Sequence, residues 1–216
     1  MLQLVGFLVI IVTVNGVPVD TDLTSLLNDY NQFVDVLPID RLFRLTNDYY
    51  NADTDFKTFL TYLEGREFSV VWNGILALPA VDDFTKYLAN ANVPVYDVIN
   101  IVAAFIGQPS VYLRTAQAFK ASRQGGLKGF VKELFSVLPV AQWQQLYAEK
   151  MKNSPAFKEF INKLRGFDYV QIKNFYSSSR EFRSFVKMFR DYGIDVGSWQ
   201  NAVKKILGWG NIFEFL

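Results

Sequence analysis

An internal repeat with a register of 101 residues constrains the fold of this chain more than any other feature. Val36-Leu37-Pro38-Ile39 returns as Val137-Leu138-Pro139-Val140. At the same offset Phe56, Lys57 and Phe59 match Phe157, Lys158 and Phe160, and no gap is needed between Leu26 and Gly107. A repeat of this length indicates a unit that occurs twice, and it has to be recognised before the fold is assigned. We therefore expect two tandem repeats of one structure.

Each repeat is predicted to form about six short helices. Asp53 and Ser154 occupy equivalent positions, are good N-cap residues, and Ser154 is followed by Pro155 at a first helical position. Apolar side chains then follow at spacings of three and four, and no sustained two-residue alternation indicates a strand. The chain is predicted to be all-α, with helices near 20–36, 39–50, 54–64, 66–77, 80–91, 95–106, 110–122, 127–137, 140–152, 155–165, 167–176, 179–191 and 196–207.

Glycine, asparagine and proline residues mark the predicted ends of these helices. Gly65 and Gly166 are expected to end helices in the left-handed conformation, and Asn92 and Gly193 to do the same in the later pair. Pro38 and Pro139 are expected to start a helix, as are Pro94 and its match Asp195. The predicted organisation is a signal peptide at 1–16, a first repeat at 17–108, a connecting helix and hinge at 109–126, and a second repeat with an aromatic tail at 127–216.

The N-terminus predicts secretion. Leu4 to Val14 is an almost unbroken apolar run, too short for a membrane span, which takes about 20 residues. Val14 and Gly16 suit the −3 and −1 positions of a cleavage site, so the mature chain is expected to start near Val17. The alternative is a buried first helix or strand.

The C-terminal tail carries Trp209, Phe213 and Phe215. These residues belong either to a packed lid or to a membrane-seeking end.

The residue types present exclude several kinds of chemistry. The chain has no histidine and no cysteine, so triad nucleophiles, disulfides and ordinary zinc sites are excluded. Its net charge is +1 and it has no long basic run, so nucleic acid is not an expected partner. The carboxylate pairs Asp53/Asp55, Asp82/Asp83 and Glu64/Glu67 lie at predicted helix ends, where acids cap or complement the dipole. We expect no enzyme activity, no cofactor and no metal.

The apolar pattern is the informative part of the sequence, with 20 Phe, 11 Tyr and 4 Trp. Broad apolar faces of short helices form a core by default, but they can also line a ligand cavity, since such cavities are mostly apolar. The candidate lining residues are Phe33, Leu42, Leu45, Phe56, Phe59, Leu63, Phe68, Phe84, Leu88, Leu134, Trp143, Leu146, Phe157, Phe160, Leu164, Phe185 and Phe189.

With the repeat in view, the chain resembles the insect allergen repeat family, which includes the major group 1 cockroach allergens, mosquito midgut microvillar proteins and nitrile-specifier proteins. The resemblance rests on Leu37-Pro38 with Leu138-Pro139, on Ser154-Pro155-Ala156-Phe157, and on Tyr192-Gly193-Ile194-Asp195-Val196. It implies helices from two repeats closed around a large apolar cavity that holds fatty acids or phospholipids. It also implies expression in the insect gut, linked to digestion, with release into the lumen or association with microvilli.

Three functions follow as hypotheses. The first is a secreted carrier of lipids or fatty acids in the insect gut. The second is a membrane-active defence protein that exchanges lipid with target membranes. An exposed aromatic tail would favour it, and its partner would be a membrane surface. The third is an interaction protein of the microvillar coat with a filled core and no ligand.

Overall fold

The computed structural model describes residues 26–107 and 123–213, with side chains placed except at 105–107. Every regular element in these two ranges is a helix, which confirms the all-α prediction. The first range, called here the first half, holds α2 (Leu26–Asp35), α3 (Ile39–Ala52), α4 (Thr54–Glu64), α5 (Arg66–Leu76), α6 (Pro79–Asn90) and α7 (Val95–Gly107). The second half holds α8 (Gly126–Val137), α9 (Val140–Asn153), α10 (Pro155–Arg165), α11 (Tyr169–Ser178), α12 (Arg180–Asp191) and α13 (Val196–Leu207).

Side-chain caps determine where several helices begin. The Asp53 carboxylate accepts a hydrogen bond from the Phe56 amide at 2.8 Å, and the Ser154 hydroxyl accepts one from the Phe157 amide at 3.1 Å. Ser179 caps α12 in the same way, so it precedes this helix instead of beginning it as predicted. These side chains satisfy amide groups that a first helical turn leaves without a partner. α3, α4 and α6 begin and end 101 residues before α9, α10 and α12.

Most predicted boundaries agree with the structure to within a residue or two. α4, α10 and α13 have the predicted bounds, whereas α11 begins at Tyr169 and ends at Ser178, two residues later than expected. Asn92 and Gly193 have the expected positive φ angles of 60° and 74°. The predicted helix at 110–122 and the signal peptide at 1–16 lie outside the described residues.

The prediction for Gly65 and Gly166 is wrong, because neither residue is left-handed. Gly65 is extended, with φ −77° and ψ 161°, and Gly166 has φ −84° and ψ 3°. Gly65 is both the last capping residue of α4 and the N-cap of α5. Because the next helix begins at once, the chain turns there in an extended conformation and needs no left-handed residue. A Cβ at Gly65 would lie 3.1 Å from the Tyr62 carbonyl oxygen, and this close approach accounts for glycine at that position.

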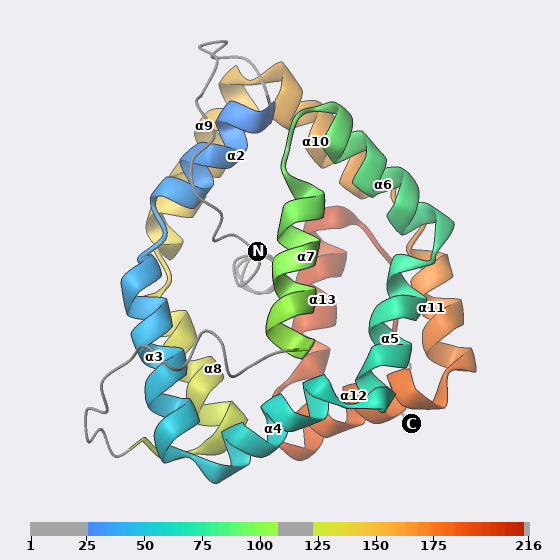
Figure 1. The fold of residues 1–216 in the computed structure, drawn as a ribbon. Helices are drawn as coiled ribbons and strands as arrows, with labels where there is room; N and C mark the ends of the chain where they lie inside the picture. Colours follow the sequence, from blue (N-terminus) through green and yellow to red (C-terminus); the bar gives the residue numbers. More distant parts are fainter. Residues whose placement is uncertain (1–25, 108–122, 214–216) are drawn as a thin grey trace.

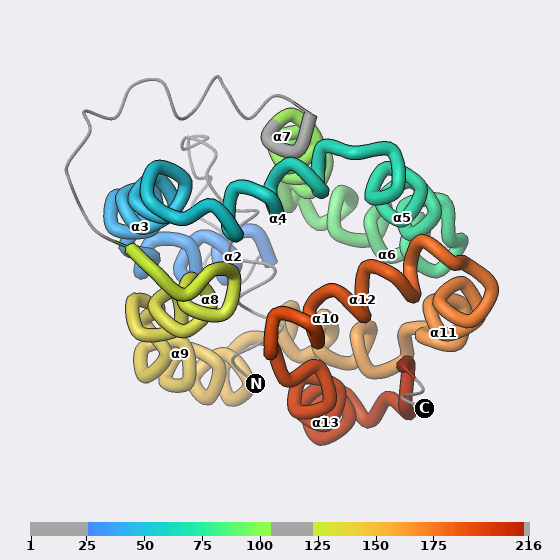
Figure 2. Tube along the Cα trace, turned by 90° about the horizontal axis from the view of Figure 1, so that it is seen from below, coloured from blue at the N-terminus to red at the C-terminus, as the bar shows by residue number. Residues whose placement is uncertain are grey.

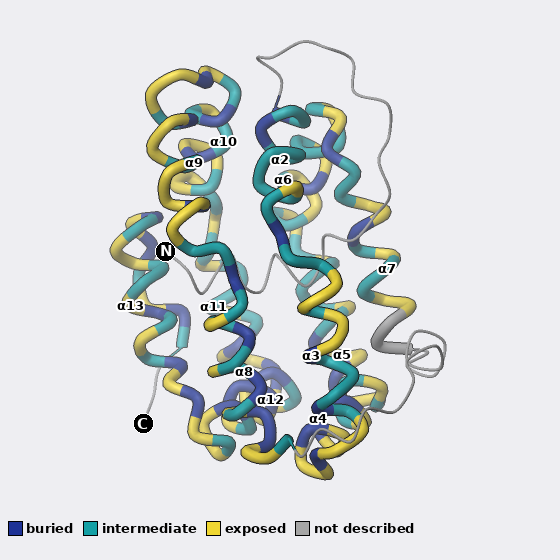
Figure 3. The backbone as a smooth tube through the Cα atoms, turned by 90° about the vertical axis from the view of Figure 1, so that its left-hand side faces the viewer, coloured by how far each residue is buried: buried dark blue, intermediate teal, exposed yellow. Residues whose placement is uncertain are grey.

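The two halves form two layers of helices that lie face to face, as Figures 1 and 2 show. Between the layers, α3 and α4 pack against α8, α2 packs against α9 and α10, and α5 packs against α11 and α12. Figure 3 shows the layers edge on, with buried segments gathered around α8 and α12. The main core therefore lies between the layers at the end of the molecule where these helices meet.

Aromatic rings fill this core. Phe56 is 1% exposed, and its ring centroid lies 4.5 Å from that of Phe130 in the other layer. Phe59 contacts Phe189, also across the layers, at 5.8 Å. Such ring pairs stabilise packing beyond the apolar area that they bury. Within the described residues, no helix is both long enough and apolar enough to cross a membrane.

Candidate functional site

The predicted lining residues divide between the main core and a second, less buried region. The core takes Leu45, Phe56, Phe59, Phe68, Leu134, Trp143, Phe185 and Phe189 as buried members, with Phe33, Leu42, Leu63 and Leu146 partly buried against it. Leu164 packs in a separate cluster with Leu207, Trp209 and Ile212. Phe157 is buried, and Phe84, Leu88 and Phe160 are partly buried.

A row of rings connects the less buried positions and crosses both layers. We call Phe33, Phe157, Phe160, Phe84, Phe167 and Trp209, in this spatial order, the aromatic row. Successive ring centroids are separated by 5.5, 5.9, 6.1, 5.9 and 5.2 Å, all within the range of aromatic contacts. The rings come from α2 and α6 of the first half and from α10 and the segments after α10 and α13 of the second.

The aromatic row differs from the core in how much of it remains accessible. Phe33, Phe84, Phe160 and Phe167 are partly buried, whereas Phe157 and Trp209 are buried at 6% and 8% exposure. A partly buried ring held on both sides by other rings keeps apolar area that an apolar ligand can cover. This arrangement suits non-covalent binding of an apolar molecule.

The C-terminal segment holds one end of the aromatic row in place. Trp209 lies between the rings of Phe167 and Tyr169, and its indole nitrogen donates a hydrogen bond to the Leu164 carbonyl oxygen at 2.8 Å. Phe213 contacts the rings of Tyr176 and Phe182. Of the two alternatives for the tail, packing is therefore confirmed for Trp209 and Phe213, while Phe215 lies outside the described residues.

A buried polar cluster joins α2 to the other layer beside the Phe33 end of the row. Asp29 is fully buried; its Oδ2 accepts a hydrogen bond from the Ser154 hydroxyl at 2.5 Å, and its Oδ1 lies 3.1 Å from Nζ of Lys150. Lys150 is 7% exposed and its next acidic neighbour, Glu149, is 4.0 Å away. An ion pair this deeply buried is stable only when both charges are matched, so it fixes α2 against α9 and α10.

A second polar cluster joins α8 to the first half. The Asp53 Oδ2 accepts a hydrogen bond from the Gly126 amide at 2.8 Å, and the Tyr49 hydroxyl donates to Glu133 at 2.8 Å. Glu133 also pairs with Arg123 at 2.5 Å. Burial, followed by the hydrogen bond to Glu133, raises the pKa of Tyr49 to about 12. The hydroxyl therefore remains a neutral donor at ordinary pH, and the role of this cluster is structural.

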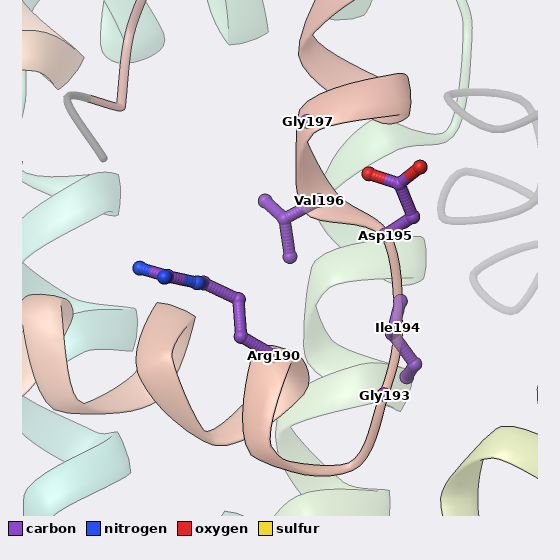
Figure 4. A pocket seen from close by; sticks show the side chains of 6 residues that line it. All are labelled: Arg190, Gly193, Ile194, Asp195, Val196 and Gly197. Carbon is purple, nitrogen blue, oxygen red and sulfur yellow. The ribbon is translucent and has the colours of Figure 1, made fainter. Parts of the chain in front are cut away.

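One pocket of about 330 Å³ lies at the turn between α12 and α13, lined by Arg190, Gly193, Ile194, Asp195, Val196 and Gly197. Figure 4 shows the Arg190 guanidinium and the Asp195 carboxylate pointing away from each other. Asp195 accepts hydrogen bonds from the amide and hydroxyl of Ser198, which lower its pKa and cap α13. The carboxylate is thus already engaged at the helix N-terminus, so the pocket is best explained as the space beside a capping turn.

The polar residues described here do not assemble an obvious catalytic group. Asp53 caps α4, Asp82 pairs with the exposed Lys86 at 2.6 Å, and Asp55 and Glu67 lie in first helical turns. Within residues 26–107 and 123–213, no group of acidic side chains has the geometry to hold a metal ion.

Sequence comparisons show which known proteins this chain is similar to. The family model described as "Insect allergen related repeat, nitrile-specifier detoxification" matches residues 25–200. The chain belongs to the insect allergen related repeat family. A relative in this family, Protein G12 of Anopheles gambiae, is 34% identical over 186 residues, which cover 86% of this chain and 88% of that protein.

For this member of the insect allergen related repeat family, sequence reasoning missed the buried charges and part of the aromatic row. Asp29 occupies an apolar stripe position of α2, three residues after Leu26 and four before Phe33, and this placement was the available signal. Phe167 was the first residue of the helix predicted at 167–176 and was not among the selected positions; in the structure it lies between α10 and α11. The Gly-Ile-Asp-Val segment, by contrast, has a clear local role. Gly193 is left-handed, Ile194 is buried and Asp195 caps α13.

Proposed function

We propose that this protein binds apolar ligands of the lipid or fatty-acid class and has no catalytic role. The partly buried aromatic row supports this most directly, because it offers apolar ring area on a rigid support. The polar cluster beside its Phe33 end is engaged in an ion pair and a helix cap. Membership of a family of insect proteins is consistent with the same role. Nitrile specification is not proposed, since no described residue supports it.

We further propose that the two halves arose by duplication and enclose an apolar cavity between their layers. The helix bounds that repeat at 101 residues and the similar cross-layer packing of α2 and α8 support the duplication. In this proposal the aromatic row forms part of the cavity wall, and its large rings leave a narrower space than leucine or valine would. Secretion into the insect gut, with a role in digestion, completes the proposal.

Two other functions remain as alternatives. A membrane-active defence protein was favoured by an exposed aromatic tail, but Trp209 and Phe213 are packed, so no described residue now supports it. A microvillar interaction protein with a filled core would use the same rings only for packing. It predicts that the protein carries and takes up no ligand.

Native mass spectrometry of the purified protein, followed by lipid analysis of what organic solvent releases, tests the binding proposal. We expect stoichiometric apolar molecules of a defined class. Uptake of a fluorescent fatty acid then locates the site: Phe84→Asp places a charge in the aromatic row and should reduce uptake. Phe43→Asp, at a side chain that is 49% exposed on α3, is the matched control and should not. A mass equal to the bare chain together with no uptake would favour the interaction protein instead.

A further inference from the structure

The two layers of the molecule carry opposite charge. Residues 26–107 contain 5 lysines and arginines and 11 acidic residues, a net charge of −6, whereas residues 123–213 contain 15 and 7, a net charge of +8. The overall charge of +1 hides this separation. Because the two halves form separate layers (Figure 2), the molecule has one basic and one acidic side, and its field can orient an approaching polyanion.

Part of the positive charge is arranged as a line along α12. Arg180, Arg183, Lys187 and Arg190, called here the basic stripe, follow one another at spacings of three, four and three residues, and all four are exposed. These spacings place them on one face of the helix over about 15 Å. The opposite face of α12 is buried through Phe182, Phe185, Val186 and Phe189. The basic stripe therefore lies on a rigid support.

Two cations of the basic stripe make contacts that leave their side chains exposed. Arg183 donates hydrogen bonds to the carbonyl oxygens of Tyr176 and Ser177. Lys187 pairs with Asp191 at 2.5 Å, but both side chains are well exposed, and such pairs are weak. Glu181 also lies on α12, and Asp195 follows it. Glu67 of α5, which packs against α12, acts with Glu181 on the Tyr62 hydroxyl, and Asp53 and Asp55 act on Tyr192 at the end of α12. Lys128 of α8 adds a further cation at the C-terminal end of the stripe. Its side chain lies beside Gly193, where a Cβ would be 3.4 Å from the Lys128 Nζ.

The fold itself does not require this stripe. The positions 101 residues earlier, on α6, are Pro79, Asp82, Lys86 and Ala89. α6 has the same length and a similar amphipathic role without a line of cations. The basic stripe is thus a property of one side of this molecule.

We propose that the basic stripe of α12 binds a linear sulfated polysaccharide. A single line of cations matches a linear polyanion, and arginine, with its planar fork of donors, suits oxyanion groups such as sulfate. A membrane surface fits less well: helices that lie on membranes combine cations with inserted apolar residues. Here the prominent exposed apolar side chains Phe43, Val70, Tyr96 and Val170 lie on α3, α5, α7 and α11 instead. Nucleic acid fits less well because no exposed ring of α12 is placed to stack on bases.

Binding of the full chain to heparin, used as the sulfated probe, tests this proposal by calorimetry and by salt elution from a heparin column. The variant R180Q/R183Q/K187Q/R190Q should bind roughly ten-fold more weakly or worse. The matched control K152Q/R165Q/K204Q/K205Q changes the net charge equally, on exposed residues of α9, α10 and α13, and should bind within about two-fold of the unmodified protein.

Thermal unfolding followed by circular dichroism checks that both variants fold. If the quadruple variant is unstable, the triple variant R180Q/K187Q/R190Q replaces it in the binding measurement, because it keeps the Arg183 hydrogen bonds. Absence of heparin binding, or equal weakening in the stripe and control variants, would overturn the proposal. So would tighter binding to phosphatidylserine vesicles or to duplex DNA than to heparin. None of these outcomes depends on the apolar ligand.

Discussion

Asp29 is a fully buried carboxylate whose charge is balanced by Lys150 of the other layer. Asp29→Asn should destabilise the protein by about 3–5 kcal/mol, because it leaves the buried ammonium group of Lys150 with only the exposed Glu149 carboxylate, 4.0 Å away. Urea unfolding measures this change. Asp82→Asn removes an exposed pair with Lys86 and should change the free energy of unfolding much less, because solvent screens such pairs. Equal small effects of the two substitutions would mean that the buried pair does not fix α2 in place.

Tyr49 makes stability depend on alkaline pH. Its pKa is raised from 10.0 to about 12 in the folded protein, by burial first and then by Glu133. Below pH 10 the hydroxyl is neutral in both states and its contribution is fully present. As the pH rises from 10 through about 12 the unfolded chain ionises first, so stability falls. Burial also raises the pKa of Tyr30, Tyr62, Tyr87 and Tyr192, which adds to the decline.

Tyr49→Phe isolates the contribution of this hydroxyl. The free energy of unfolding from urea titrations at about pH 9 and about pH 11.5 should fall less in the variant than in the unmodified protein. Tyrosine ionisation followed by ultraviolet absorbance provides the independent check. Equal declines in both proteins would show that Tyr49 is not the group responsible.

At the scale of helices, capping serines differ in how deeply the second partner of the hydroxyl is buried: Asp29 is fully buried and Glu181 is only partly buried. Ser179 caps α12 and contacts the Glu181 side chain, so Ser179→Ala should cost about 1 kcal/mol. Ser154 caps α10 and also donates to the buried Asp29, so Ser154→Ala should cost more, about 2–3 kcal/mol. Urea midpoints of the two variants give the comparison. The reverse order would imply that the hydrogen bond between Ser154 and Asp29 contributes little.

These caps also explain how much of the fold could be predicted. An N-cap residue followed by apolar positions at spacings of three and four is local information, so α4, α10 and α13 were placed correctly from sequence. Gly65 and Gly166 were misassigned because the conformation at a helix end depends on where the next helix starts, which residue type alone does not determine. The contact between Asp29 and Ser154 joins residues 125 apart, and no local pattern specifies it.

The candidate site was predictable to a similar extent. Phe33, Phe84, Phe157 and Phe160 lie on helical stripes and were identified, but the same criterion selected Phe56 and Phe185, which are buried in the core. Periodicity reports which face of a helix turns inward. How closely the opposing layer covers that face depends on tertiary packing.

At the scale of the whole molecule, the layers approach each other closely at a helical glycine. Gly74 of α5 faces Phe175 of α11, and a Cβ at this position would lie only 2.1 Å from the Phe175 ring. Gly74→Ala should therefore destabilise the protein by about 1–3 kcal/mol, although alanine is the better helix former, because the Phe175 ring or the helix that carries it must move. Gly74→Ala combined with Phe175→Leu should recover part of the loss. Calorimetric melting of the single and double variants measures both effects.

Gly166→Ala is the control. Its Cβ would lie 3.5 Å from the nearest neighbour, and the φ of −84° suits alanine, so this substitution should leave stability unchanged or slightly raised. If Gly74→Ala behaved like Gly166→Ala, the Phe175 ring would be free to move aside, and its close contact with Gly74 could not be what holds the two halves in register.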